Sequence, residues 1–179
     1  MKTGVDYAKA GWETMKKDLV NNIIVFFVAS MTNIVLGVGV VSMFYCANKA
    51  RKGEKLEIGD ALWGLKNNLV QNIIAVIVFI VPFYICFLPG LYLGPQMIYA
   101  FPMLAREEEK EGIAAIKASM ARAKAAGGFM DHLIRFIILG FVGGIGEVAC
   151  GVGLLVTMPL SIMGWDAAYD DLPAAGGGE

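Results

Sequence analysis

Few residues in this chain have the types and spacing that chemistry requires. A catalytic site needs polar groups that converge and whose ionisation is tuned. His132 is the only histidine, and it follows Asp131 at the start of an apolar stretch, where a capping or interfacial role is expected. The three cysteines lie in or beside apolar blocks without metal-ligand spacing, which indicates small hydrophobic residues: Cys46, Cys86 and Cys150. The sequence therefore predicts no catalytic residue, no metal site, no cofactor and no enzyme.

Glu147 is the one acidic residue between Phe136 and Trp165, and it is the single candidate for a functional carboxylate. An acid inside a membrane segment is a candidate for a proton or cation path. The preceding "GGIG" favours another interpretation, in which Glu147 lies at a water-exposed turn. The stretches "GVGVV" and "GVGLL" lack the third glycine of a dinucleotide-binding loop, so we expect these glycines to bring helices close together.

The bulk composition is that of a membrane protein. The 179 residues are 57% hydrophobic and 17% charged, and the mean hydropathy is +0.62. Lys, Arg, Asp and Glu are absent from residues 19–48, 67–105 and 136–146. Runs of about 20 apolar residues are long enough to cross a bilayer. The net charge of −1 gives no attraction for nucleic acid, so membrane lipids are the expected partners.

One motif recurs along the chain. "LVNNII" at 19–24 returns as "LVQNII" at 69–74 and, more loosely, as "LIRFII" at 133–138. Apolar residues at helical spacing precede each copy, and an apolar stretch with a central breaker follows it. We therefore predict an all-α integral membrane protein with six short membrane helices in three hairpins, amphipathic interfacial helices and a pseudo-threefold repeat. The single membrane domain would be 1–172, with units of about 5–48, 56–105 and 112–170, before a flexible acidic tail, 173–179.

Whether residues 19–48 form one long span or a hairpin is left open by their length, since 30 residues suit one tilted helix or two short ones. The second block must turn, and Pro89–Gly90 is the expected place. The third is interrupted at Gly143–Glu147. Three hairpins would put all 15 Lys and Arg on one face, and cytoplasmic loops concentrate these residues. We therefore favour hairpins with both termini in the cytoplasm.

Two sets of residues are candidates for the membrane interface. Side chains that could meet lipid headgroups or the interface are Lys49, Arg51, Lys52, Lys55, Arg135, Trp12, Trp63 and Trp165. Arg135 could equally extend its charged end to water. Polar residues just inside the membrane border could bond between helices or hold headgroups, and these are Asn21, Asn22, Gln71 and Asn72.

From Leu88 onward the chain resembles a known family. The relevant stretches are "LPGLYLGPQMIYA", "EGIAAIKASMARAKAAGG" and "GVGLLVTMPLSIMGWDAAYDDL", and the match covers about residues 35–172. They resemble an uncharacterised family of bacterial six-span integral membrane proteins, similar also to the membrane domain of glycerophosphoryl diester phosphodiesterases. The short first block departs from the family pattern. The resemblance implies six spans and transfers no catalytic residue.

Two functions fit these features. The first is a structural or scaffolding multi-pass protein that self-associates into a homo-oligomer in the bacterial inner membrane, where hairpins inserted from one side would favour a curved bilayer. The alternative is a transporter or channel subunit for a small solute or ion, because repeats and broken helices are common in transporters. Few polar groups are available to line a path, which favours the scaffold.

Overall fold

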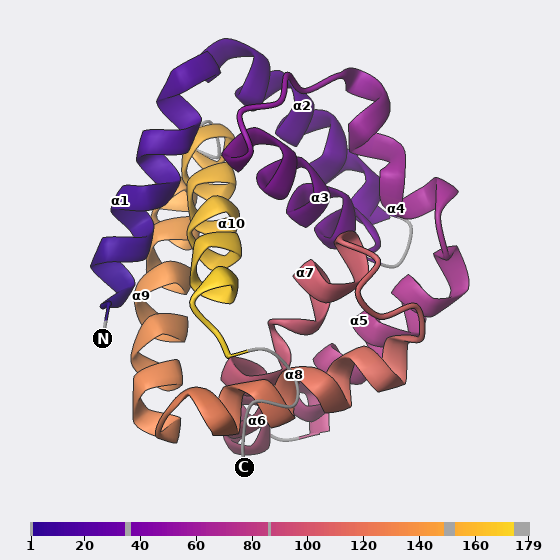
Figure 1. The fold of residues 1–179 in the computed structure, drawn as a ribbon, viewed down its shortest axis with the longest axis vertical. Helices are drawn as coiled ribbons and strands as arrows, with labels where there is room; N and C mark the ends of the chain where they lie inside the picture. The colour runs from indigo at the N-terminus through magenta and orange to yellow at the C-terminus, as the bar shows by residue number, and fades with distance from the viewer. Residues whose placement is uncertain (1, 35–36, 86, 149–152, 174–179) are drawn as a thin grey trace.

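The computed structural model describes residues 2–34, 37–85, 87–148 and 153–173, and all regular structure in these ranges is helical (Figure 1). The α-helices are α1 (Gly4–Met15), α2 (Leu19–Met31), α3 (Gly39–Arg51), α4 (Trp63–Lys66), α5 (Leu69–Ile85), α6 (Phe87–Met97), α7 (Ala100–Ala105), α8 (Gly112–Ala126), α9 (Phe129–Val148) and α10 (Leu154–Asp170). Three short 3₁₀ helices join them: Lys16–Asp18, Thr32–Ile34 and Ile58–Leu62. The all-α prediction is confirmed.

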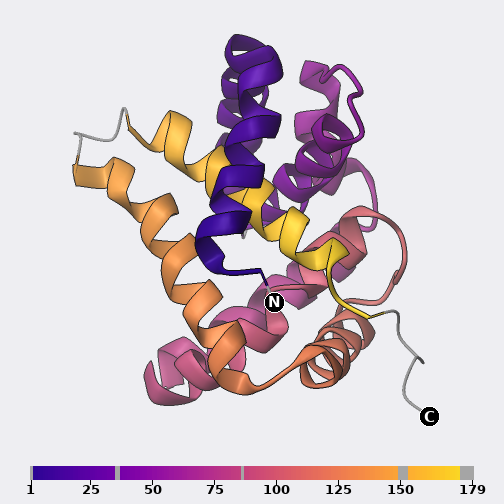
Figure 2. The same cartoon turned by 60° about the vertical axis from the view of Figure 1, so that its left-hand side comes forward.

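Each apolar block contains two helices that contact one another: α2 with α3, α5 with α6, and α9 with α10. Residues 19–48 therefore do not form one long span. The second block also contains α7, which follows α6 and which we count as the end of the second pair. Figure 2 shows α9 and α10 running in opposite directions. The expected turn at Pro89–Gly90 is wrong, because both residues lie in the first turn of α6, where proline has no intrahelical hydrogen bond to lose. The expected break at Gly143–Glu147 is also wrong, since α9 continues to Val148.

The prediction of six membrane helices is wrong. Among the described residues, one stretch is long and apolar enough to cross a bilayer, Phe129–Gly146 in α9. A second is added if Ile58–Lys66 and Leu69–Ile85, which meet at a bend of 82°, count as one span. Helices α2 and α3 have 13 residues each, or about 20 Å at ~1.5 Å per residue, against a hydrocarbon core of about 30 Å. Apolar composition indicated membrane segments, but it did not fix their length.

The segment ahead of each helix pair packs closely on another pair through a glycine. A Cβ atom on Gly11 of α1 would lie 2.5 Å from the carbonyl oxygen of Leu160 in α10, where α1 crosses α10 (Figure 2). On Gly64 of α4 it would lie 2.9 Å from the Val38 carbonyl oxygen, and on Gly112 of α8 2.3 Å from that of Gln71. Since real Cβ atoms do not approach so closely, glycine is required at all three crossings.

Aromatic side chains from the three helix pairs meet in one core. Phe44 of α3 stacks on Phe101 of α7 with ring centroids 6.2 Å apart, and Tyr99 packs edge-on against Trp165 at 5.6 Å. Phe136 of α9 lies 5.9 Å from the same Trp165 ring. Such pairs add to the gain from burial. The core therefore fixes the three pairs relative to one another and aligns their last residues.

The crossing of α1 and α10 gives a testable prediction. Gly11→Ala places a methyl group against backbone atoms that cannot move aside easily, and we expect a loss of about 1–3 kcal/mol in the free energy of unfolding. Gly59→Ala is the matched control, because nothing lies within 4 Å of its added Cβ; it should be neutral or stabilising by less than about 1 kcal/mol. Denaturant unfolding of the purified chain measures both, and equal effects would contradict the close crossing.

Candidate functional site: an ion-pair cluster at the helix ends

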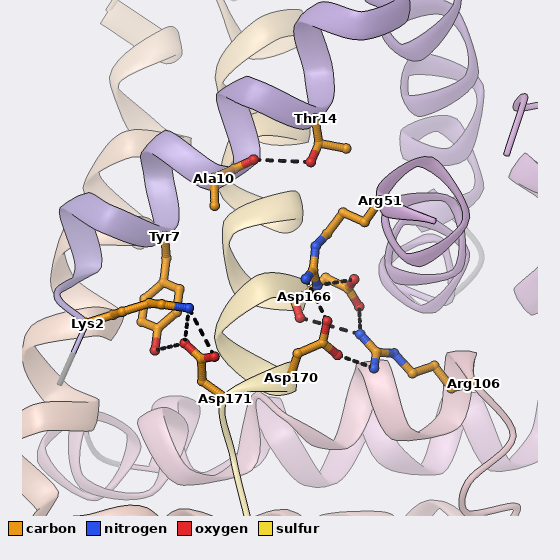
Figure 3. A network of polar contacts seen from close by, with 9 residues as sticks. All are labelled: Lys2, Tyr7, Ala10, Thr14, Arg51, Arg106, Asp166, Asp170 and Asp171. Atoms are coloured by element: carbon orange, nitrogen blue, oxygen red, sulfur yellow. Dashed lines mark hydrogen bonds and ion pairs between the residues drawn. The ribbon is translucent and has the colours of Figure 1, made fainter. Parts of the chain in front are cut away.

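The last residues of the three helix pairs converge. Arg51 is the final residue of α3, Arg106 follows the last turn of α7, and Asp166 and Asp170 are one turn apart near the end of α10. Because residues four apart share a face of a helix, both aspartates point the same way. Figure 3 shows the two arginines approaching this face from different helices. We call Arg51, Arg106, Asp166 and Asp170 the ion-pair cluster.

Each arginine in the cluster bridges both aspartates. Arg51 places its two terminal nitrogens 2.9 Å from Asp166 Oδ2 and 2.6 Å from Asp170 Oδ2. The terminal nitrogens of Arg106 contact the other two oxygens: one lies 2.7 Å from Asp166 Oδ1, and the other pairs with Asp170 Oδ1. All four carboxylate oxygens are thus paired, and two positive charges balance two negative ones. The fork shape of the guanidinium suits this two-point contact.

The cluster is largely removed from water. The Asp166 side chain is completely buried, whereas those of Arg106 and Asp170 are 15% and 41% exposed. Burial by itself lowers the pKa of Arg106, but Asp166 and Asp170 more than compensate and raise it above its ordinary value. A buried carboxylate is costly unless it is paired and hydrogen-bonded. Asp166 therefore needs both arginines, and they come from the other two helix pairs.

Tyr169 extends the cluster to α8. Its hydroxyl donates to Glu108 Oε2 at 2.6 Å and accepts from Arg122, which also pairs with Glu108 at 3.1 Å. The Arg106 guanidinium lies 4.7 Å from the centre of the Tyr169 ring, and that of Arg122 lies 5.4 Å from it. Both distances are within the range of a cation–π contact. The connection between α8 and the end of α10 is thus polar and aromatic.

A parallel contact joins α1 to the end of α10. Asp171 accepts from the Tyr7 hydroxyl at 2.9 Å and pairs with Lys2 at 3.0 Å (Figure 3). Burial tends to raise the pKa of Asp171, but the hydrogen bonds from Lys2 and Tyr7 outweigh it and lower the pKa below its ordinary value. The Tyr7 ring also meets Arg135, whose guanidinium lies 5.1 Å from the ring centre. Tyr7 therefore lies between a carboxylate and a cation.

The structure places the predicted interfacial residues in different environments. Lys52 and Lys55 are exposed, while Lys49 pairs with Asp60 at 2.8 Å and Arg51 belongs to the cluster. Arg135 is 4% exposed, so its charged end does not reach water. The tryptophans also differ: Trp12 is exposed, Trp63 stacks on Tyr45 at 4.9 Å, and Trp165 is buried. Lys52, Lys55 and Trp12 remain open to a lipid surface.

The predicted polar contacts lie at the joints where helix pairs begin. Asn22 donates to the Met15 carbonyl at 3.0 Å, and Asn72 donates to those of Gly64 and Asn67 at 2.9 and 2.8 Å. At the third joint His132 Nε2 lies 2.8 Å from the Ala123 carbonyl. These contacts satisfy carbonyls that lack a helical partner. Asn21 donates to the Leu56 carbonyl, and Gln71 accepts from the Gly112 N–H, at 2.9 and 3.0 Å.

His132 has a defined tautomer within this arrangement. A carbonyl can only accept, so Nε2 carries a proton. In the neutral form of the ring this leaves Nδ1 to accept the hydrogen bond of the Tyr99 hydroxyl, 3.1 Å away. Glu147 lies in the last turn of α9, and its side chain falls outside the described part of the structure, as do Cys86 and Cys150. Cys46 is a buried free thiol. Of the predicted acidic tail, only Pro173 is described.

Sequence reasoning missed three of the four cluster residues. Arg106 stands at the start of the charge run "REEEKEG", and runs of this kind are typical of solvated segments. Asp166 and Asp170 fall in the "GWDAAYDDL" stretch. The available signal was Asp166 itself, an acid directly after an apolar block, since buried acids are rare unless paired. Its partners could not be identified, because 60 residues separate it from Arg106 and 115 from Arg51.

The chemistry of the cluster is that of a structural link. All four carboxylate oxygens are paired with the two arginines, so neither aspartate is free to act as a base or nucleophile. Among the residues the structure describes, no three His, Cys, Asp or Glu side chains are grouped so that they could hold a metal ion. Comparisons of the chain with protein-family models, with curated proteins and with solved structures found no match. The resemblance to six-span bacterial membrane proteins therefore stays a prediction.

Asp166 provides the test of the cluster. Asp166→Asn leaves two guanidiniums facing a neutral amide, and breaking a buried pair in this way is expected to cost about 3–5 kcal/mol of unfolding free energy. Asp170→Asn is the matched control, because the same arginines contact a carboxylate that is 41% exposed. Its effect should be clearly smaller. Denaturant titrations measure both, and equal losses would show that burial of Asp166 is not decisive.

Proposed function

We propose that this chain is a structural, scaffolding membrane protein that self-associates into a homo-oligomer in the bacterial inner membrane. It would enter the bilayer from the cytoplasmic side, with the ion-pair cluster near that surface. Residues 19–48, 67–105 and 136–146 contain no Lys or Arg, so the basic residues lie before, between and after the apolar blocks, which supports this orientation. The protein would act through its shape and its contacts with lipid and with its own copies, without a chemical step.

The observation that carries the proposal is the exposure of α9. Its membrane-length window, Phe129–Gly146, is only 22% buried. The core helix of a water-soluble protein is mostly buried, whereas α9 presents Ile137 and Phe141, which are 54% and 68% exposed. Other exposed apolar side chains cluster around the contact of α5 and α6: Tyr84, Ile85, Phe87 and Leu88. Patches of this kind mark surfaces that meet a membrane or a partner.

The unequal helix lengths support a role in shaping the bilayer. The 20 residues of α9 reach about 30 Å, but the 13 residues of α2 and of α3 reach about 20 Å. Helices that enter from one side and stop short of the other displace lipid mainly in one leaflet. The resulting mismatch thins or bends the bilayer locally. Such insertion would favour curved membrane.

Two glycines on α9 support self-association. Gly140 and Gly144 are exposed, four residues apart, and nothing lies within 4 Å of the position of an added Cβ at either residue. On an apolar helix this spacing lets a second helix approach closely, as in dimers built on G-x-x-x-G. Their bare face, on the one described helix that is long and apolar enough to cross a bilayer by itself, is a natural contact between copies.

These glycines give the test of the proposal. We expect wild-type chain in lipid nanodiscs to form a uniform oligomer, and the Gly140→Leu, Gly144→Leu double variant to be mostly monomeric, because the new side chains hold the helices apart. Ile137→Leu, on the same helix and also exposed, should leave the oligomer unchanged. Mass photometry gives the copy number, and carbonate extraction of native membranes reports insertion.

A monomeric wild-type chain would contradict the scaffold. If that monomer also carried ions or solutes into sealed vesicles, and Glu147→Gln abolished the flux, the function would be transport. Extraction of the chain by carbonate would contradict membrane insertion altogether. The three outcomes are separable, since copy number, flux and extraction are measured independently.

A further inference from the structure

A cavity of about 370 Å³ lies where the first and third helix pairs meet. One wall is the second half of α2, with Phe26, Phe27 and Met31, and the opposite wall is the first half of α10, with Leu155 and Met158. Helix α10 contacts both α2 and α3 (Figure 1). The cavity is separated from the ion-pair cluster along α10, because Leu155 lies three turns before Asp166 on that helix.

The lining of the cavity is apolar and adaptable. Besides aromatic and leucine side chains it contains Met31, Met43 and Met158, and methionine adjusts its shape to irregular apolar ligands. The Ser30 hydroxyl is already occupied, since it donates to the Phe27 carbonyl at 2.7 Å. Pro159 adds carbon atoms and has no N–H to offer. Asn33 also lines the cavity, and its side-chain Oδ1 is buried without a hydrogen-bond partner among the described residues. That oxygen can accept from one water or one ligand hydroxyl, whereas the other lining residues offer water no free side-chain group, and apolar space stays dry unless an apolar ligand fills it.

The rim of the cavity opens to the surface that we propose faces lipid. Phe26 and Met43 at its base are 1% and 0% exposed, whereas Phe27 and Met31 at its edge are 45% and 49% exposed. The volume falls in the range of small-molecule sites, about 300–1,000 Å³. No charged side chain is among its lining residues, so a headgroup gains nothing by entering. The chemistry selects an uncharged, flexible hydrocarbon chain.

We propose that this cavity binds one acyl chain of a membrane lipid, held between α2 and α10. The bound acyl chain would fill the space between the first and third helix pairs, at the ends of these helices that lie away from the ion-pair cluster. The statement that the acyl chain belongs to a membrane lipid rests on the proposed insertion of the protein into the bilayer. The affinity of the cavity for an acyl chain does not depend on that insertion.

The test uses the full chain in a steroid-based detergent, which carries no alkyl chain of its own. The probe is palmitic acid with a photoreactive diazirine in the middle of its chain, and mass spectrometry locates the label. We expect saturable labelling of the cavity walls, competed by unlabelled palmitic acid. Ser30→Phe, which puts a ring into the cavity, should lower the saturable labelling about tenfold. Leu155→Trp fills the cavity from the opposite wall and should act alike if Ser30→Phe fails to fold.

Val20→Phe is the matched control, because it adds a ring on α2 at a position that is 69% exposed. It should label as wild type does. Labelling that does not saturate, or that survives both filling variants, would overturn the proposal. Saturable labelling of a chain that carbonate removes from membranes would keep the acyl-chain site and contradict insertion, so the two failures are distinguishable.

Discussion

The structure depends on the burial of one carboxylate, that of Asp166. Its side chain is completely buried, and it is paired with Arg51 and Arg106. Desolvating this group would cost more than most single interactions return, so α10 can stay where it is only while both arginines are in place. Those arginines end the other two helix pairs. The requirement of one acid therefore fixes the ends of all three pairs at a single point, with Asp170 completing the charge balance.

The rest of the molecule is arranged around this polar end. Glycines at 11, 64 and 112 let the connecting segments lie directly on the backbone of neighbouring helix pairs, and Asn22, Asn72 and His132 close the joints where the pairs begin. The polar groups of the cluster and of the joints bond to one another within the protein, while α9 and the α5–α6 contact leave apolar side chains exposed. A paired charged end and an exposed apolar body support the proposal that one end of the molecule meets water and the body meets lipid.

The sequence carried local information well and long-range information poorly. The first two copies of the repeated motif mark helix starts, since Leu19 and Leu69 begin α2 and α5, and apolar periodicity is a local property. The third copy does not, because Leu133 lies one turn inside α9, which begins at Phe129. The prediction of six membrane helices was wrong because apolar composition alone does not distinguish a helix of 13 residues from a span of 20. The predicted turn at Pro89 was wrong because proline is tolerated in the first turn of a helix. The cluster was invisible because its pairs join residues as far as 115 positions apart, and no periodicity encodes such a contact.

A double-mutant cycle between Asp166 and Arg106 tests the central claim most directly. Asp166→Asn, Arg106→Met and the double variant would be compared with wild type by denaturant unfolding. If the buried pair holds the helix ends together, each single change leaves the other charge stranded, and the double variant should be more stable than the sum of the single losses predicts, by at least about 1 kcal/mol. Losses that add to within about 0.5 kcal/mol would show that the two residues are not coupled, and that the convergence of the helix pairs rests on something else.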